Sequence, residues 1–271
     1  MAHAREPVFR ALELTAAALV RAQKLDLHYE GLATVPHAGG AVLAINHTAY
    51  VDFLPAAYGV YLADRRIRFL IKSEVMDIAI MRFLVNHTRT IPVDRSAGAE
   101  AYVHAVRSLR DGEIVAVYPE ATISRSFELK EFKSGAVRMA AEAGVPIIPV
   151  IVWGAHRQWT KGGRRRMGRS GIRVDVRFGA PIRVPRGVDV DETTADLRAV
   201  MTRMLHEVQD GYGPHPAGEF WVPARLGGSA PTPDEAVVIE EDEAQRKAAI
   251  RAEKVAERAR KDAARQRRPR S

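Results

Sequence analysis

Apolar residues in this chain form short runs that alternate with longer stretches of helical periodicity. Runs of roughly four to eight apolar residues are typical of buried strands, and apolar positions three and four apart are typical of amphipathic helices. The predicted strands are residues 40–45, 67–71, 90–93, 114–118, 147–153 and 172–178. The predicted helices between them are residues 52–62, 75–85, 97–109, 134–143 and 193–208. Such alternation indicates an α/β fold, with a mostly parallel or mixed sheet flanked by helices in a single layered domain.

The two ends of the chain depart from this pattern. Residues 7–23 predict an N-terminal amphipathic helix, either packed on the domain or lying at a membrane interface with its arginines near lipid head groups. Pro and Gly accumulate from residue 213, and the segment from Ala244 to Ser271 holds 11 basic and 3 acidic residues. With few large apolar side chains, this segment predicts a disordered basic tail, either solubilising or attracted to a membrane. We therefore expect an amphipathic helix (1–24), an α/β domain (25–212), and a Pro/Gly-rich linker with a charged tail (213–271).

Composition narrows the function classes. The chain has no cysteine, which excludes disulfides, thiolate metal sites and a cysteine nucleophile. It has no uncharged apolar run of about 18 residues, so we expect no transmembrane helix. The net charge of +8 favours an acidic partner: nucleic acid, an anionic membrane surface or a phosphorylated substrate. Nucleic acid is not expected, because the basic C-terminal segment lacks the aromatic side chains that such modules interleave with their cations.

One histidine and one carboxylate stand five positions apart, where the first predicted strand gives way to a helix: His47 and Asp52. Within a continuous strand they would point to opposite faces, and within a helix they would lie about 140° apart. They can therefore meet only if a loop separates strand from helix. In that arrangement His47 is a candidate general base, and Asp52 would orient its ring and stabilise the imidazolium.

The residues around this pair carry a family resemblance. Asn46-His47 followed by Asp52 resembles the His-x-x-x-x-Asp motif of the glycerophospholipid acyltransferase family, which includes the 1-acyl-sn-glycerol-3-phosphate (lysophosphatidic acid) acyltransferases. Further segments resemble the family's blocks in the family's order. They are Lys72-Ser73-Glu74, Ile91-Pro92-Val93-Asp94-Arg95, Tyr118-Pro119-Glu120-Ala121-Thr122, Phe132-Lys133-Ser134-Gly135-Ala136 and Val145-Pro146-Ile147-Ile148-Pro149-Val150. The resemblance covers residues 31–152.

This resemblance implies an O-acyltransferase that moves a fatty acyl group from acyl-CoA or acyl carrier protein to a lysophospholipid hydroxyl. Lysophosphatidic acid is the first candidate acceptor, and glycerol-3-phosphate or a lyso-glycolipid is the alternative. His47 and Asp52 are the catalytic candidates. The substrate-binding candidates are Arg95, Lys72, Lys133, Glu120 and Thr122. The thioester is a co-substrate, and we expect no bound cofactor or metal, because none of the nine histidines lies in a metal-ligand pattern.

Several positions depart from the family pattern and put the acceptor in doubt. Ala121 replaces a glycine, and Ile123 stands where an arginine usually follows the threonine, with Arg125 two residues further on. Pro92 replaces an aromatic residue before Arg95. No Gly-x-Ser-x-Gly motif is present, which favours direct transfer over a covalent acyl-enzyme or a serine hydrolase.

The densest cationic segment of the predicted domain follows Trp159. It comprises Lys161, Arg164, Arg165, Arg166, Arg169 and Arg173. Such a loop could contact anionic lipid or the donor's phosphates, or simply be a solvated hairpin. We expect a cytoplasmic protein associated peripherally with the inner face of the cell membrane. The contrasting hypothesis is a non-enzymatic basic protein that binds membrane or nucleic acid.

Overall fold

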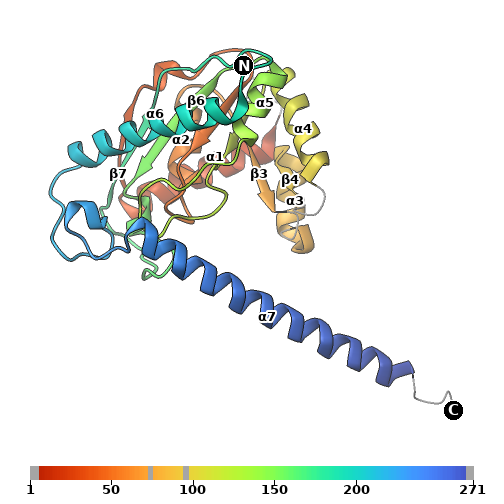
Figure 1. Ribbon diagram of the computed structural model, residues 1–271. Helices are drawn as coiled ribbons and strands as arrows, with labels where there is room; N and C mark the ends of the chain where they lie inside the picture. Colours follow the sequence, from red (N-terminus) through yellow and green to blue (C-terminus); the bar gives the residue numbers. More distant parts are fainter. Residues whose placement is uncertain (1–5, 73–75, 94–97, 267–271) are drawn as a thin grey trace. The chain divides into compact units, whose positions relative to one another are not determined.

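A seven-stranded mixed sheet forms the centre of the protein (Figure 1), described by a computed structural model over residues 6–72, 76–93 and 98–266. The strands are β1 (Asp26–Glu30), β2 (Ala41–Ile45), β3 (Ile67–Lys72), β4 (Ile91–Val93), β5 (Ile114–Val117), β6 (Ile147–Trp153) and β7 (Arg173–Phe178). Their order in the sheet is β1-β7-β6-β2-β5-β3-β4. Strands β6, β2, β5, β3 and β4 are mutually parallel, whereas β7 is antiparallel to β6 and parallel to β1.

Helices cover both faces of the sheet. The helices of this unit are α1 (Pro7–Gln23), α2 (Phe53–Leu62), α3 (Ala79–Thr88), α4 (Gly98–Arg110), α5 (Gly135–Ala143) and α6 (Val190–Gly211), whereas α7 (Pro233–Gln266) belongs to a separate unit. Central strand β2 is buried along its whole length, and its residues alternate between the two cores. Val42 and Ala44 pack with α4, α5 and α6, whereas Leu43 and Ile45 pack on the opposite side with α2. A sheet buried on both faces requires the continuous apolar runs seen in the sequence.

The α/β class and the predicted strands and helices of the domain are confirmed, with small shifts at their ends. The helix predicted at 75–85 is α3, which begins at Ala79 and ends at Thr88. Strand β1 was not predicted. Its half-buried residues alternate with exposed ones, which is the period expected of an edge strand.

Helix α1 packs on α2 and α3, and the face that it turns inward mixes half-buried apolar residues with a buried glutamate. Glu13 is 7% exposed and accepts a hydrogen bond from Arg66 Nε at 2.8 Å. Glu6, which precedes the helix, pairs with Arg68 at 2.9 Å. Leucines on the outward side are exposed instead, with Leu14 at 55% and Leu19 at 47%. The helix therefore buries ion pairs together with part of its apolar side, such as Phe9 and Val20, and leaves some leucines exposed.

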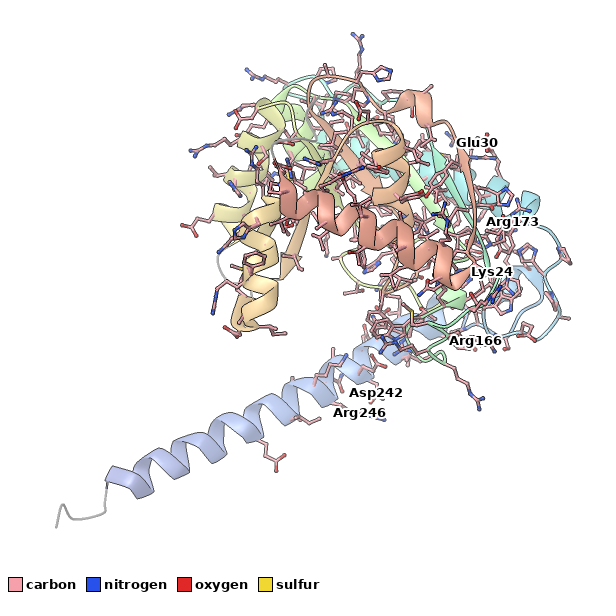
Figure 2. The ribbon with its side chains drawn as sticks, turned by 180° about the vertical axis from the view of Figure 1, so that it is seen from behind. Lys24, Glu30, Arg166, Arg173, Asp242 and Arg246 are labelled. Atoms are coloured by element: carbon pink, nitrogen blue, oxygen red, sulfur yellow. The ribbon has the colours of Figure 1, made fainter. Side chains whose placement is uncertain are left out.

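The region after residue 212 differs from its expected form. Residues 213–230 belong to the same compact unit as the domain, and Val222 is fully buried. The predicted disordered tail is also wrong, because residues 233–266 form helix α7 in a separate unit. Its start carries a capping box, in which Thr232 and Glu235 exchange hydrogen bonds. One turn apart, Asp242 and Arg246 pair at 2.8 Å, as i,i+4 charges do on a helix surface (Figure 2).

Candidate active site

His47 and Asp52 meet at the carboxyl end of β2, where a loop separates this strand from α2. The Nδ1 atom of His47 lies 3.2 Å from Oδ2 of Asp52. The same oxygen accepts the backbone N–H groups of Thr48 and Ala49 at 2.8 and 2.7 Å. Asp52 is fully buried, whereas the His47 side chain keeps 19% of its surface exposed. The loop therefore brings the two side chains together, as their spacing requires, with the imidazole facing outward from a buried carboxylate.

The Asp52 carboxyl group experiences opposing effects. Burial raises its pKa, while the hydrogen bonds from His47, Ala49 and Thr48 favour the charged form. Its second oxygen, Oδ1, is buried and has no hydrogen-bond partner among the described residues. All of the carboxylate's bonds therefore converge on the oxygen that faces His47.

Asn46 anchors the chain immediately before the histidine. It is fully buried, and its side-chain amide exchanges two hydrogen bonds with the backbone of Val152 in β6, at 3.1 and 2.7 Å. The amide thus extends the pairing of β2 and β6 by one step beyond the end of the ladder. This fixes where the loop leaves the sheet. Asn46 was noted in the sequence only for its place beside the histidine in the motif.

The backbone of His47 is also held by the loop that follows the neighbouring strand β5. Its N–H donates to Oε1 of Glu120 at 2.7 Å, and its carbonyl accepts the N–H of Ser124 at 2.8 Å. Glu120 is 3% exposed, and its Oε2 accepts the N–H of Lys130 at 3.0 Å. Burial raises the pKa of Glu120 to about 8, although the two backbone bonds act in the opposite direction. Both oxygens of Glu120 are therefore occupied by backbone groups, not directed at an acceptor.

The aromatic ring of Tyr118 lies directly beside the imidazole of His47. The two rings are stacked, with centroids 4.0 Å apart and an interplanar angle of 23°. Burial, reinforced by the charge of Asp52, raises the pKa of Tyr118 well above its ordinary value, so the phenol is neutral at physiological pH. The sequence did not predict this contact, because Tyr118 was noted only as the residue before Pro119 in the motif.

The other predicted substrate-binding residues are only partly described. Lys72 ends β3 at the same edge of the sheet as His47, but its side chain lies outside the described part. Arg95 lies outside the described residues altogether. Thr122 is half-buried, and its hydroxyl accepts a hydrogen bond from Lys130 Nζ at 2.7 Å. Lys133 is exposed, and its backbone N–H binds the carbonyl of Pro119.

The two departures from the family pattern have different structural effects. Ala121 adopts a φ of 60°, in the left-handed region that glycine occupies without penalty. Ile123 is 3% exposed and packs inside the loop. The guanidinium of Arg125 lies next to Gly162, at the start of the basic loop. The loop 121–130 therefore holds a strained alanine and a buried isoleucine where the family pattern has glycine and arginine.

The basic loop 161–169 is attached directly to the loop 46–52, which carries His47. Thr160 Oγ1 donates to the carbonyl of Thr48 at 2.6 Å, and the ring of Trp159 lies 4.7 Å from that of Tyr50. At its far end the loop is tied to α1, because Gln23 Nε2 donates to the carbonyl of Met167 at 3.0 Å. Figure 2 shows Lys24 and Arg166 at the same end of the domain. The basic loop thus lies beside both the end of α1 and the loop 46–52.

Within residues 6–72, 76–93 and 98–266, no group of three or more His, Asp or Glu side chains is arranged to hold a metal ion.

Comparison with known proteins gives the site a context. The family model described as Acyltransferase matches residues 26–153. The 1-acyl-sn-glycerol-3-phosphate acyltransferase of Limnanthes douglasii is 28% identical over 172 residues, which cover 62% of this chain and 57% of the plant protein. The protein of the same name from Borreliella burgdorferi is 25% identical, over 48% of this chain and 52% of its own length. The chain thus spans a little over half the length of these curated relatives.

A solved structure has the same fold. The crystal structure of the 1-acyl-sn-glycerophosphate (LPA) acyltransferase PlsC from Thermotoga maritima superimposes with a TM-score of 0.58 and 22% sequence identity. The superposition covers 72% of this chain and 79% of that chain. The matched family region ends with Trp153, so it contains the strands that carry His47 and Glu120.

Proposed function

Since the chain belongs to the acyltransferase family, with residues 26–153 as the matching region, we propose that it transfers a fatty acyl group to a lysophospholipid hydroxyl. The donor is an acyl thioester, acyl-CoA or acyl carrier protein, and the first candidate reaction converts lysophosphatidic acid to phosphatidic acid. The observation that carries the proposal is the His47–Asp52 pair, 3.2 Å apart at the carboxyl edge of a parallel sheet, where open α/β sheets bind their ligands.

In this reaction His47 is the general base. Asp52 engages Nδ1, so the ring keeps its proton there and leaves Nε2 to accept the proton of the attacking hydroxyl. The carboxylate then stabilises the imidazolium while the hydroxyl oxygen attacks the thioester carbonyl. Positioned general-base catalysis of this kind contributes about 10²- to 10⁴-fold. The thiolate leaving group takes up the proton as the tetrahedral intermediate collapses.

Direct attack by the acceptor fits the surroundings better than an acyl-enzyme intermediate. The Thr48 side chain is 1% exposed, so its hydroxyl is poorly placed to serve as a nucleophile. The backbone N–H groups of Thr48 and Ala49 already donate to Asp52. They are therefore occupied, and the donors that stabilise the oxyanion must come from another part of the site.

The acceptor has two candidate classes. Arg95, Lys72 and Lys133 are the cations proposed to bind a lysophosphatidic acid phosphate, because guanidinium and ammonium groups bind phosphate oxygens strongly. The buried Ile123, in place of the family's arginine, favours an alternative acceptor such as a lyso-glycolipid or glycerol-3-phosphate. Product analysis with purified protein and oleoyl-CoA across these acceptors separates the classes. A kcat/KM highest for lysophosphatidic acid supports the first, and a preference for an uncharged lyso-glycolipid overturns the phosphate assignment.

We further propose that the protein works at the surface of an anionic membrane, on the inner face of the cell membrane. In the described ranges, no helix is both long and apolar enough to cross a bilayer. The exposed leucines of α1, Leu12, Leu14 and Leu19, instead offer apolar side chains that could enter the membrane interface. The exposed arginines of the basic loop flank the end of this helix and suit anionic head groups.

Vesicle co-sedimentation tests the membrane part separately from catalysis. Leu14→Glu introduces a charge on α1 at a side chain that is 55% exposed, and Val103→Glu is the matched control on α4 at 57%. We expect Leu14→Glu to weaken binding to phosphatidylcholine–phosphatidylglycerol vesicles at least about tenfold, since inserting a charge into the interface is unfavourable. Val103→Glu should bind like the parent protein. Equal binding by both variants would contradict an insertion role for α1.

A further inference from the structure

We infer that Glu120 is a positioning residue that sets the location of His47, and not a group that binds the acceptor. The inference rests on the proposed acyl transfer for its kinetic test, but it concerns a geometry that exists without substrate. It replaces the role expected from sequence, in which Glu120 is a substrate-binding residue.

Access argues against direct binding of substrate by Glu120. The residue is 3% exposed, and its two oxygens accept N–H groups at 2.7 and 3.0 Å from two different segments of backbone. An acceptor hydroxyl would have to displace one of these bonds. Breaking either bond would leave a buried N–H unpaired, which costs more than the new bond gains.

The same contacts give Glu120 direct control over the catalytic histidine. One oxygen holds the N–H of His47, while the N–H of Ser124, from the loop that follows Glu120, holds the His47 carbonyl. The backbone of His47 is thus fixed on both sides by a single loop. Because the imidazole projects from this backbone toward Asp52, movement of the backbone changes the 3.2 Å separation of Nδ1 and Oδ2.

The other end of this connection reaches α6. Glu120 Oε2 holds the N–H of Lys130, and the carbonyl of Lys130 accepts Nε of Arg198 at 2.8 Å. Arg198 also donates to the carbonyl of Leu129. A continuous series of hydrogen bonds therefore runs from the helix α6 through Glu120 to the backbone of His47. A carboxyl side chain is suited to this place because each of its two oxygens can accept one of the two backbone N–H groups.

The decisive variant is Glu120→Gln, which keeps the size of the side chain and replaces one acceptor by an NH₂ donor. At least one of the two backbone bonds is then lost. We expect kcat to fall about 30- to 100-fold, since a shift of about 1 Å in a catalytic group costs roughly 10²-fold, and KM for the acceptor to stay within about twofold. Glu128→Gln is the matched control. Its carboxylate lies in the same loop but binds His206 and Arg225, so its kcat should be unchanged.

A second readout does not depend on activity. In ¹⁵N-histidine-labelled protein, the ring signals of His47, assigned from their loss in His47→Ala, report the Nδ1–H bond to Asp52. Glu120→Gln should move these signals, and Glu128→Gln should not. If Glu120→Gln does not fold, Glu120→Asp gives the same test, because the shorter side chain cannot reach both N–H groups.

The outcomes separate the hypotheses. A raised acceptor KM with unchanged kcat would make Glu120 a binding group and overturn the inference. Unchanged kinetics together with unchanged ring signals would also overturn it. If the parent protein has no transferase activity, the proposed function fails, and the ring signals still decide the positioning role on their own.

Discussion

Replacing Asp52 with asparagine removes a charge while leaving most of the geometry in place. The amide oxygen can take the position of Oδ2 and still accept the N–H groups of Thr48 and Ala49. The NH₂ group then occupies the place of Oδ1, which is buried without a partner among the described residues. Asp52→Asn therefore tests the electrostatic contribution of the carboxylate, separately from its role in shaping the loop.

The magnitude follows from the 3.2 Å separation of Nδ1 and Oδ2. Two unit charges at this distance attract by about 5 kcal/mol at an effective dielectric constant near 20, and by about 1.3 kcal/mol in water. Asp52 is buried and the His47 side chain is 19% exposed, so an intermediate value of about 3–4 kcal/mol is expected for stabilisation of the imidazolium. At about 1.36 kcal/mol per tenfold change in rate, kcat should fall roughly 10²- to 10³-fold.

Initial rates of thiol release from oleoyl-CoA, with saturating acceptor, give this value. Asp26→Asn is the matched control, because Asp26 also pairs with a histidine, His28, at 2.9 Å, but on the exposed surface of β1. Its kcat should be unchanged. If Asp52→Asn folds normally and keeps kcat within about threefold of the parent, the carboxylate does not stabilise a charged histidine and the general-base account is wrong.

Three further outcomes are expected. Ala121→Gly should raise the free energy of unfolding by about 0.5 kcal/mol in urea titration, since relief of left-handed strain of about 1–2 kcal/mol exceeds the entropy cost of glycine; a loss of stability would refute the strain. The pKa of Glu120 is raised from about 4.5 to about 8 in the folded protein, so between these pH values the folded state retains a proton that the unfolded chain releases. The free energy of unfolding should therefore fall as pH rises from about 4.5 to 8, by at most about 1.4 kcal/mol per pH unit. Thermal unfolding across this range should show a shallower slope in Glu120→Gln, and an equal slope would contradict the assignment. Arg95→Ala should raise the apparent KM for a phosphorylated acceptor, and an unchanged KM would remove Arg95 from the phosphate site.

The fold follows from sequence wherever burial is continuous. Strand β6 is buried at all seven positions, and its uninterrupted apolar run leaves no alternative reading. β1 was harder to predict, because an edge strand of five residues with three exposed polar side chains resembles a loop. The segment 213–230 was misjudged because its Pro and Gly content is typical of linkers, while one buried valine and its neighbouring tryptophan fix it to the domain.

Helix α1 illustrates what a pattern alone leaves undecided. Its sequence predicts two faces but not which residues meet the domain, because that depends on arginines at the start of β3, more than 50 positions away along the chain. Arg66, just before the strand, pairs with Glu13, and Arg68 pairs with Glu6, so Glu13 turns inward. The α7 helix was predictable in part, since Thr232 and Glu235 have the spacing of a capping box.

The active site, like the fold, was only partly predictable from the sequence. The spacing of His47 and Asp52 predicts that they meet across a strand–loop–helix junction, and the structure brings their side chains to 3.2 Å. The partners of the His47 backbone could not be predicted, because Glu120 and Ser124 reach it through pairing of β2 with β5, which joins segments some 70 positions apart. A motif identifies which residues matter, whereas the role of each depends on which atoms the fold places within reach.

His47 is proposed to drive acyl transfer to a lipid hydroxyl. Thiol release from oleoyl-CoA by purified protein, with and without lysophosphatidic acid and compared with His47→Ala, tests this role. We expect release that requires both the acceptor and His47, with the variant folded and at least about 10²-fold slower. Full activity in His47→Ala would contradict the catalytic role, and His47-dependent release without any acceptor would identify a thioesterase instead.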